Sequence, residues 1–229
     1  MNVPPATARD DWRNEILIVS AGPDVVLPAA PLPTDCVIGV DGGVANALRL
    51  GLQVDLAIGD FDSLDDYTAQ VVRAWGVPIE QHPAEKDQTD LELALLRARR
   101  LNPSRITVLA SPSGRLDHLF ASLLSLSAAA DANTEVDAYC GTASIHVIVR
   151  ERRIAGAPGE LISLFAVDGD AHGVTTSGLR YQLRHETLAA GTRGTSNAFT
   201  TELVVITVSE GRLLAICPYG ADYKPCGAG

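Results

Sequence analysis

The order of apolar runs along the chain is the feature that most restricts its fold. Between Glu15 and Cys140, short apolar runs typical of buried strands alternate with longer segments whose apolar residues recur at helical spacing. Beyond Gly141 only short strand-like runs occur, separated by Gly, Pro, Asp and Asn. Alternating strands and helices predict a Rossmann-like parallel sheet with helices on both faces, and strands alone predict a small all-β sandwich or barrel. We therefore expect an α/β domain over residues 15–141 and an all-β domain over residues 142–229.

The expected elements follow from these runs. In the first domain, strands are expected at Glu15–Ser20, Cys36–Val40, Leu56–Asp60, Val77–Gln81, Arg105–Ala110 and Glu135–Cys140. Helices are expected at Val44–Leu50, Asp65–Trp75, Leu91–Leu101 and Arg115–Ala130. In the second domain, strands are expected at Ser144–Val149, Leu161–Val167, Val174–Thr176, Leu179–Leu183, Leu203–Val208 and Leu213–Ile216.

Length, charge and cysteine content narrow the class of protein. The chain has 229 residues, enough for one large domain or two small ones with a core. A formal charge of −10 argues against a general nucleic-acid binder but not against anionic substrates, because bound metal ions can invert the local field. The four cysteines form no CxxC pair, and neither a bilayer-spanning segment nor a secretory signal is visible. We expect a cytoplasmic protein without a membrane partner.

Asp60 and Asp62 follow an apolar run that stops at Gly59. In an extended backbone, residues i and i+2 point the same way, so both carboxylates can face one point past the end of a strand, where ligands bind in open α/β sheets. Two converging carboxylates repel unless a cation or proton lies between them, and Mg²⁺ prefers such oxygen ligands. A metal site and a pair of solvated loop acids that cap a helix at Leu64 are equally compatible with this stretch.

A Gly-Gly turn follows the expected strand Cys36–Val40. Asp41-Gly42-Gly43 would join that strand to the helix that begins at Val44. Glycines let backbone N–H groups approach an anion, and a helix N-terminus favours negative charge, so the turn could hold a phosphate group. A plain tight turn explains the two glycines equally well.

A second acidic motif precedes the helix Leu91–Leu101. Thr89 or Asp87 can cap this helix with a side-chain oxygen. Asp87 and Asp90 are three residues apart and share a face if both lie on the first turn. They either complement the helix dipole, which is the favoured interpretation, or add ligands to a metal centre.

Two further polar groups could bind ligands. Arg115, Asp117 and His118 open the long helix and could handle phosphate, because arginine offers several donors to phosphate oxygens. The simpler interpretation is an Arg115–Asp117 surface pair with His118 packed against the helix. In the second domain, Ser196 and Asn197 lie in a polar loop that could contact a ligand or could simply be flexible.

Five motifs in this order resemble the thiamine pyrophosphokinase family. They are Asp41-Gly42-Gly43, Gly59-Asp60-Phe61-Asp62-Ser63, Asp87-Gln88-Thr89-Asp90, Gly114-Arg115-Leu116-Asp117-His118 and Ser196-Asn197. The resemblance implies an α/β catalytic domain, a C-terminal β-sandwich and a homodimer whose thiamine pocket lies between subunits. It also implies an enzyme that moves the β,γ-diphosphate of ATP onto the hydroxyl of thiamine, giving thiamine diphosphate and AMP.

The same resemblance implies roles for single residues. The expected Mg²⁺ ligands are Asp60, Asp62 and Asp90, with Asp87 close by. The expected nucleotide site comprises Asp41, Gly42, Gly43, Asp87, Thr89, Arg115 and His118. Ser196 and Asn197 would contact thiamine, Arg115 would stabilise charge during transfer, and Asp62 or Asp117 would accept the hydroxyl proton.

The chain departs from the family pattern in ways that leave other functions open. It has Pro112 and Ser113 where the family is richer in glycine, and no tryptophan in the β domain, where Phe199 or Tyr219 could stack on thiamine instead. One alternative is a pyrophosphokinase acting on a pterin alcohol, with the same metal chemistry. Another is a non-catalytic regulator that binds nucleotide or thiamine, and a Mg²⁺-dependent phosphohydrolase is a third.

Overall fold

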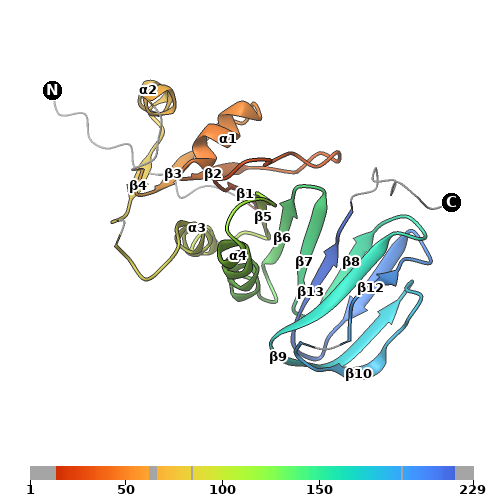
Figure 1. The fold of residues 1–229 in the computed structure, drawn as a ribbon. Coiled ribbons are helices and arrows are strands. Elements are labelled where there is room, and N and C mark those ends of the chain that lie inside the picture. Colours follow the sequence, from red (N-terminus) through yellow and green to blue (C-terminus); the bar gives the residue numbers. More distant parts are fainter. Residues whose placement is uncertain (1–13, 62–65, 84, 192, 220–229) are drawn as a thin grey trace. The chain divides into compact units, whose positions relative to one another are not determined.

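The computed structural model describes residues 14–61, 66–83, 85–191 and 193–219 (Figure 1). Asp62, one of the expected metal ligands, lies outside the described residues. The chain divides into two compact units, Met1–Ser125 and Leu126–Gly229. The fold is mixed α/β, with parallel strands in the first unit and antiparallel strands in the second.

The first unit is built on parallel strands in the order β4-β3-β2-β1-β5. They are β1 (Glu15–Val19), β2 (Cys36–Val40), β3 (Leu56–Gly59), β4 (Ile79–Gln81) and β5 (Arg105–Ala110). Ile18 of β1 is in register with Ile38 of β2 on one side and Val108 of β5 on the other. Residues of both faces are apolar and buried in β2, as expected for a parallel strand that is covered on both sides.

The helices of the chain are α1 (Gly43–Arg49), α2 (Asp66–Trp75), α3 (Asp90–Arg99) and α4 (Leu116–Ala129). Both α1 and α3 pack on β1 and β2, and Figure 1 shows them on opposite sides of these strands. α1 buries Val44 and Ala47, and α3 buries Leu91, Ala94, Leu95 and Ala98. Because the strands are parallel, their carboxyl ends lie at one shared edge, where the loops that lead into the helices begin.

The strands of the second unit are antiparallel neighbours in the order β6-β7-β13-β9-β12-β8, and β10 and β11 pair with β9. They are β6 (Glu135–Cys140), β7 (Ala143–Ile148), β8 (Glu151–Ala155), β9 (Leu161–Ser177), β10 (Arg184–Leu188), β11 (Asn197–Ala198), β12 (Leu203–Thr207) and β13 (Glu210–Cys217). The central strand, β9, is long enough to pair with β13 through its first half and with β10 and β12 through its second.

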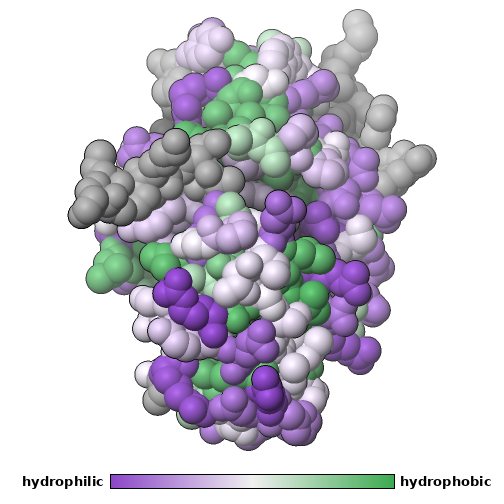
Figure 2. Space-filling view, turned by 90° about the vertical axis from the view of Figure 1, so that its right-hand side faces the viewer, coloured by the Kyte–Doolittle hydropathy of each residue, from purple (hydrophilic) through white to green (hydrophobic). Residues whose placement is uncertain are grey.

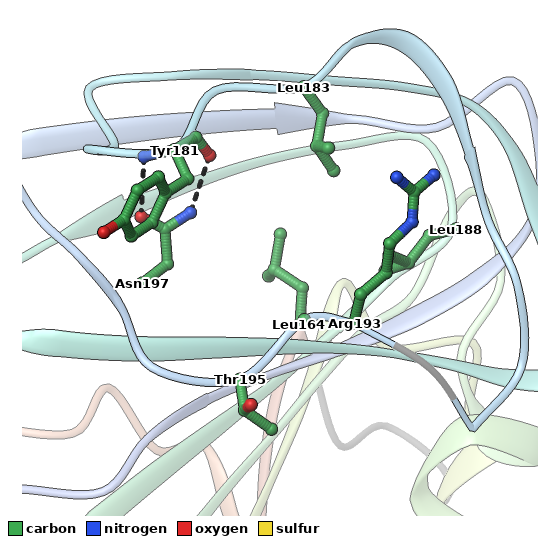
Figure 3. Close-up of a pocket in the computed structure, with 8 residues that line it drawn as sticks. Leu164, Tyr181, Leu183, Leu188, Arg193, Thr195 and Asn197 are labelled. Carbon is green, nitrogen blue, oxygen red and sulfur yellow. Dashed lines mark hydrogen bonds between the residues drawn. The ribbon is translucent and has the colours of Figure 1, made fainter.

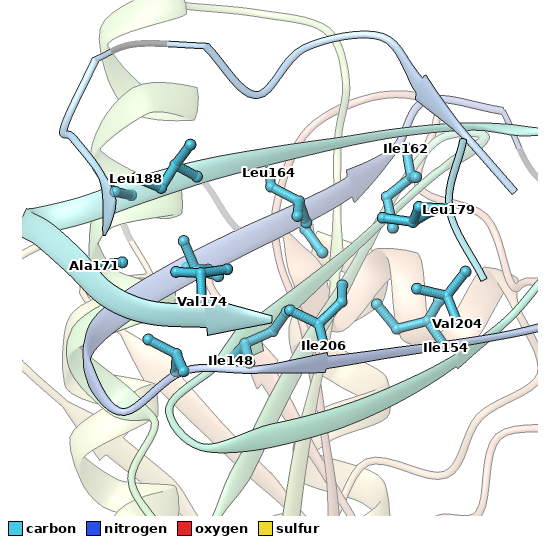
Figure 4. Close-up of a cluster of buried hydrophobic side chains, with 14 of the residues drawn as sticks. Ile148, Ile154, Ile162, Leu164, Ala171, Val174, Leu179, Leu188, Val204 and Ile206 are labelled. Carbon is cyan, nitrogen blue, oxygen red and sulfur yellow. The ribbon is translucent and has the colours of Figure 1, made fainter. Parts of the chain in front are cut away.

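A cluster of buried apolar side chains holds the second unit together (Figure 4). Val204 and Ile206 of β12 are buried at alternate positions, as the period-2 geometry of a strand requires. Leu179 and Leu183, near the two ends of the segment between β9 and β10, lie in the same cluster or pack against it. This segment is therefore anchored at both ends on the core.

The structure corrects three expectations for the second unit. β9 is one strand of 17 residues where two were expected, because the backbone continues through the exposed Asp168-Gly169-Asp170 by adopting positive φ at Asp168 and Gly169. Leu179–Leu183 is not a strand, and β10 follows it instead. β8 was missed because Arg152 takes one of its two buried positions, where the sequence pattern requires an apolar residue.

Hydrophilic residues are spread over the face shown in Figure 2, among smaller hydrophobic patches. In the part of the chain that the structure describes, each helix is too short or too polar to cross a membrane.

Candidate active site

Two acidic residues lie at the carboxyl edge of the parallel strands. β2 and β3 are parallel neighbours, so Asp41 after β2 and Asp60 after β3 come to the same edge. Oδ1 of Asp41 accepts a hydrogen bond of 3.1 Å from the N–H of Asp60, and the N–H of Asp41 donates one of 2.9 Å to the carbonyl of Ile58. These two hydrogen bonds, to Ile58 of β3 and to Asp60, fix the position of the Asp41 carboxyl group.

Two glycines are required by close packing at this edge. A Cβ atom at Gly59 would lie 1.7 Å from Oδ1 of Asp41, and one at Gly43 would lie 2.0 Å from the carbonyl oxygen of Val19. Gly43 lets α1 begin directly against β1, with Gly42 as the N-cap residue and no side-chain cap. Of the Gly-Gly pair, Gly43 is therefore required by packing, whereas a Cβ atom at Gly42 would make only an ordinary contact of 3.5 Å with Cβ of Ala21.

Asp90, the first residue of α3, brings a third carboxyl group to Asp41. Burial raises the pKa of Asp41 to about 7, together with a hydrogen bond to the Asp90 carboxyl group and the charges of Asp90 and Asp60. A hydrogen bond from the N–H of Phe61 acts in the opposite direction. The pKa of Asp41 therefore lies well above the usual range of a carboxyl group.

A lysine supplies positive charge to this acidic group. Nζ of Lys86 lies 2.8 Å from Oδ1 of Asp90, and 14% and 19% of the two side-chain surfaces are exposed. Burial lowers the pKa of Lys86, but the hydrogen bond to Asp90 and the charges of Asp90, Asp60 and Asp41 outweigh it, so that the net shift is upward. Lys86 also donates a 3.0 Å hydrogen bond to the carbonyl of Pro83.

Thr89, not Asp87, caps α3. Oγ1 of Thr89 accepts a hydrogen bond of 3.2 Å from the N–H of Glu92, and Oε2 of Glu92 accepts one of 2.7 Å from the N–H of Thr89. This reciprocal capping box fixes the first turn, which carries Asp90. Asp87 is exposed and precedes the helix.

The acidic residues have the donor chemistry of a magnesium site. Carboxylate oxygens are the ligands that Mg²⁺ prefers, so the donor set fits this ion. Among the described residues, which leave out Asp62, no group of three Asp, Glu, His or Cys side chains is placed to hold a metal ion. Instead, Asp90 contacts Lys86 and shares a hydrogen bond with Asp41.

Arg115 and Asp117 form an exposed pair at the start of α4. Nε and Nη2 of Arg115 donate to Oδ1 and Oδ2 of Asp117 at 3.1 and 2.5 Å. The hydrogen bonds from Arg115 lower the pKa of Asp117 to about 2. The surface-pair interpretation is confirmed, but His118 is exposed, so the expectation that it packs against the helix is wrong.

A pocket of about 270 Å³ lies in the second unit, beside the loop that contains Ser196 and Asn197. It is lined by Leu164, Tyr181, Leu183, Leu188, Arg193, Gly194, Thr195 and Asn197. Figure 3 shows leucine side chains in its middle, with Tyr181 and Arg193 at opposite ends. Asn197 is buried and its amide bonds to the backbone of Tyr181, whereas Ser196 is exposed and its N–H donates to Oγ of Ser163 at 3.1 Å.

Comparison with known proteins identifies the family. Models described as "Thiamin pyrophosphokinase, catalytic domain" and "Thiamin pyrophosphokinase, vitamin B1 binding domain" match residues 33–138 and 145–213. A thiamine pyrophosphokinase of Bacillus subtilis is 30% identical over 184 residues, 74% of this chain and 82% of that protein. The chain belongs to the thiamin pyrophosphokinase family. The resemblance drawn from the five motifs is thereby confirmed.

Solved structures of thiamin pyrophosphokinases share the fold. The crystal structure of the Bacillus subtilis enzyme superposes with a TM-score of 0.78 at 27% identity, covering 92% of this chain and 100% of that one. That of the Geobacillus thermodenitrificans enzyme gives 0.74 at 28% identity, covering 92% and 99%. The acidic residues at the strand ends fall in the region of the family's catalytic domain, and the pocket falls in that of its vitamin B1 binding domain.

Two residues of the candidate site in this member of the thiamin pyrophosphokinase family were missed in the sequence. Lys86 is one of only two lysines among 18 basic residues and directly precedes the motif that ends at Asp90. Its position beside this acidic motif could have indicated it from the sequence. Tyr181 is the aromatic residue of the pocket and is 66% exposed. Phe199, one of the two expected aromatic residues, is buried in the core, and Tyr219 is not among the residues that line the pocket.

Proposed function

We propose that this chain transfers the β,γ-diphosphate of ATP to the hydroxyl group of thiamine, giving thiamine diphosphate and AMP, with Mg²⁺ as the metal. One observation carries the proposal. A single chain holds acidic residues at the ends of parallel strands, in the region of a thiamin pyrophosphokinase catalytic domain, and a largely apolar pocket, in the region of a vitamin B1 binding domain.

We assign the metal to Asp60, Asp62 and Asp90, with Asp87 close by. Bound there, Mg²⁺ would offset the charge of the polyphosphate and orient its oxygens. The oxygen-only donor set supports the assignment. So does the raised pKa of Asp41, because a divalent cation would relieve the repulsion among these carboxylates.

The nucleotide phosphates belong to the loops around these carboxylates. We assign them to Asp41, Gly42, Gly43, Asp87, Thr89, Arg115 and His118. The exposed guanidinium group of Arg115 offers a planar pair of donors to phosphate oxygens, either near the attacked β-phosphorus or on the leaving AMP.

A carboxylate must accept the proton of the attacking hydroxyl group, and Asp62 and Asp117 are the candidates. While paired with Arg115, Asp117 is a weak base, because its pKa is about 2. Transfer of Arg115 from Asp117 to a phosphate oxygen would return that pKa toward its ordinary value and make Asp117 a better proton acceptor.

The acceptor site is assigned to the pocket beside Ser196 and Asn197. In this proposal a Rossmann-like domain, residues 15–141, binds ATP and Mg²⁺. A β-sandwich domain, residues 142–229, binds thiamine and forms the homodimer contact. The enzyme acts in the cytoplasm. Apolar walls with few polar groups are typical of sites for small heteroaromatic ligands.

The test is formation of AMP from ATP and Mg²⁺ with and without thiamine, followed by chromatography. Thiamine-dependent AMP with an equal amount of thiamine diphosphate is the expected result. AMP formed only with a pterin alcohol would overturn the acceptor, and phosphate release without any acceptor would indicate a phosphohydrolase. Thiamine or nucleotide binding without any turnover would favour a regulator.

A further inference from the structure

We propose that Lys86 is a positioning residue of the metal site: its ammonium group holds Asp90 in the metal-free protein and leaves it when Mg²⁺ enters with the nucleotide. The proposal rests on the proposed function in one respect, the assignment of Mg²⁺ to Asp90. It adds a residue that controls when this ligand becomes available.

The contacts of Lys86 place it within the acidic group and not on the open surface. Its Nζ atom touches Asp90 at 2.8 Å and the carbonyl of Pro83 at 3.0 Å. An ordinary surface ion pair leaves both side chains in water, as the pair Arg153–Glu151 does with 68% and 52% exposed, whereas Lys86 and Asp90 are only 14% and 19% exposed. The pair is therefore less screened by solvent than a surface pair.

The residue type suits a group that must move. Sixteen of the 18 basic residues in this chain are arginine, and Lys86 is one of two exceptions. An arginine would grip a carboxylate through two parallel hydrogen bonds, whereas an ammonium group is a single point charge on a flexible stem. Lysine at this position can therefore release Asp90 without breaking a two-bond fork.

The ammonium group and a metal ion compete for one oxygen. Oδ1 of Asp90 already contacts Nζ of Lys86, and a Mg²⁺ ion would bind a carboxylate oxygen at about 2.0–2.1 Å. Two cations on the same oxygen repel each other strongly at low solvent exposure. The metal can therefore take this oxygen only if the ammonium group leaves it.

Competition by Lys86 makes the site favour metal that arrives with polyphosphate. Free Mg²⁺ must displace the ammonium group without giving it a new partner. Mg²⁺ bound to ATP brings phosphate oxygens, which attract the released ammonium group. The lysine thereby links occupation of the metal site to the presence of the nucleotide.

The first test measures metal binding in the absence of nucleotide. Mn²⁺, which binds the same oxygen ligands and is visible by electron paramagnetic resonance, is titrated into the wild type, Lys86→Met and the charge-preserving control Lys86→Arg. We expect Lys86→Met to bind Mn²⁺ about threefold to tenfold more tightly than the wild type. A purely structural lysine would give weaker or unchanged binding on removal, and either result overturns the proposal. Lys86→Arg should bind no more tightly than the wild type.

The second test uses the wild-type protein, so it does not depend on how the variants fold. Acetylation of lysine by a succinimidyl ester is followed by mass spectrometry, with Lys224, the other lysine of the chain, as the internal reference. Saturating Mn²⁺ should raise the labelling rate of Lys86 several-fold relative to Lys224, since displacement frees the amine. An unchanged or lower relative rate would overturn the proposal.

The outcomes separate this proposal from the proposed function. Thiamine-dependent AMP formation by a wild type whose Lys86 does not respond to metal removes the role of Lys86 and leaves the activity. Tighter Mn²⁺ binding by Lys86→Met, in a protein that makes no AMP with thiamine, supports the role of Lys86 and removes the activity.

Discussion

At the residue scale, the proton that Asp41 holds makes the stability of the folded protein depend on pH. The pKa of Asp41 is raised from 3.8 to about 7, so between these values the folded protein holds a proton that the unfolded chain has released. The unfolded state then binds fewer protons than the folded state, and stability falls as pH rises. The metal-free protein should therefore lose stability between about pH 4 and pH 7.

Asp41→Asn should remove this pH dependence. Asparagine accepts the positive φ of 47° at this position, can still accept the N–H of Asp60, and carries no charge to repel Asp60 and Asp90. In buffer with a chelator at pH 8, we expect its melting temperature to exceed that of the wild type, by about 2–4 °C for each kcal/mol gained. At pH 5 the two should converge. An equal difference at both pH values, measured by thermal denaturation, would show that the charge of Asp41 is not the cause.

A residue of the candidate site could be predicted when its partners are close to it in the sequence, and not when they are distant. Thr89 caps the helix that it precedes, and Asp60 follows its own strand, so sequence neighbours were sufficient. The position of Tyr181 depends on Asn197, sixteen residues further on, which accepts its N–H at 2.9 Å and donates to its carbonyl at 2.7 Å. No local pattern contains that information.

The same contacts predict that Asn197→Ala destabilises the protein. The Asn197 amide makes two hydrogen bonds to the Tyr181 backbone and one to the N–H of Ala198, and the side chain is buried. Each of the three bonds contributes about 0.5–1.5 kcal/mol net, so we expect a loss of about 1.5–4.5 kcal/mol in urea denaturation. The matched control is Ser196→Ala, at an exposed residue, which should stay within about 0.5 kcal/mol. Equal effects of the two substitutions would contradict the role given to Asn197.

At the element scale, strands in which apolar residues take most of the buried positions were predicted, and β8, where an arginine takes one of only two buried positions, was not. β2, β5 and β6 lie at the bounds expected from the sequence. β8 was missed because Arg152 is buried between Asp137 and Glu135 of β6, and its Nη1 lies 2.5 Å from Oε2 of Glu135. The hydrophobic pattern predicts that an arginine faces solvent. Only the ion pairs formed in the folded protein show that this arginine is buried.

β8 offers a direct comparison between a buried and an exposed arginine. Arg152→Met would leave the Asp137 carboxylate, 8% exposed, without its cationic partner, although His146 remains 2.8 Å away. Loss of one partner of a buried ion pair costs about 3–5 kcal/mol. Arg153→Met breaks only the exposed pair with Glu151 and should cost less than about 1 kcal/mol. Urea denaturation of both variants checks the ranking, which similar losses would refute.

At the scale of the whole molecule, the change from alternating strands and helices to strands alone could be read from the sequence, and the order of the strands could not. Alternation of strands and helices is a local property and predicted the parallel strands of the first unit. In the second unit β13, near the end of the chain, pairs between β7 and β9, and this placement depends on contacts across more than 60 residues, such as Leu213 with Ile148. A run of short strands is compatible with many such orders.

Because the acidic residues and the pocket belong to different units, their functions should be lost separately. Asp60→Asn removes a proposed metal ligand and should lower turnover by on the order of a hundredfold or more, with thiamine binding by calorimetry unchanged within about twofold. Tyr181→Ala changes an exposed pocket residue and should weaken thiamine binding by on the order of tenfold, while leaving affinity for a non-hydrolysable Mg²⁺–ATP analogue unchanged. Circular dichroism confirms that both variants are folded. If Asp60→Asn also abolished thiamine binding, or Tyr181→Ala abolished nucleotide binding, the assignment of one ligand to each unit would be wrong.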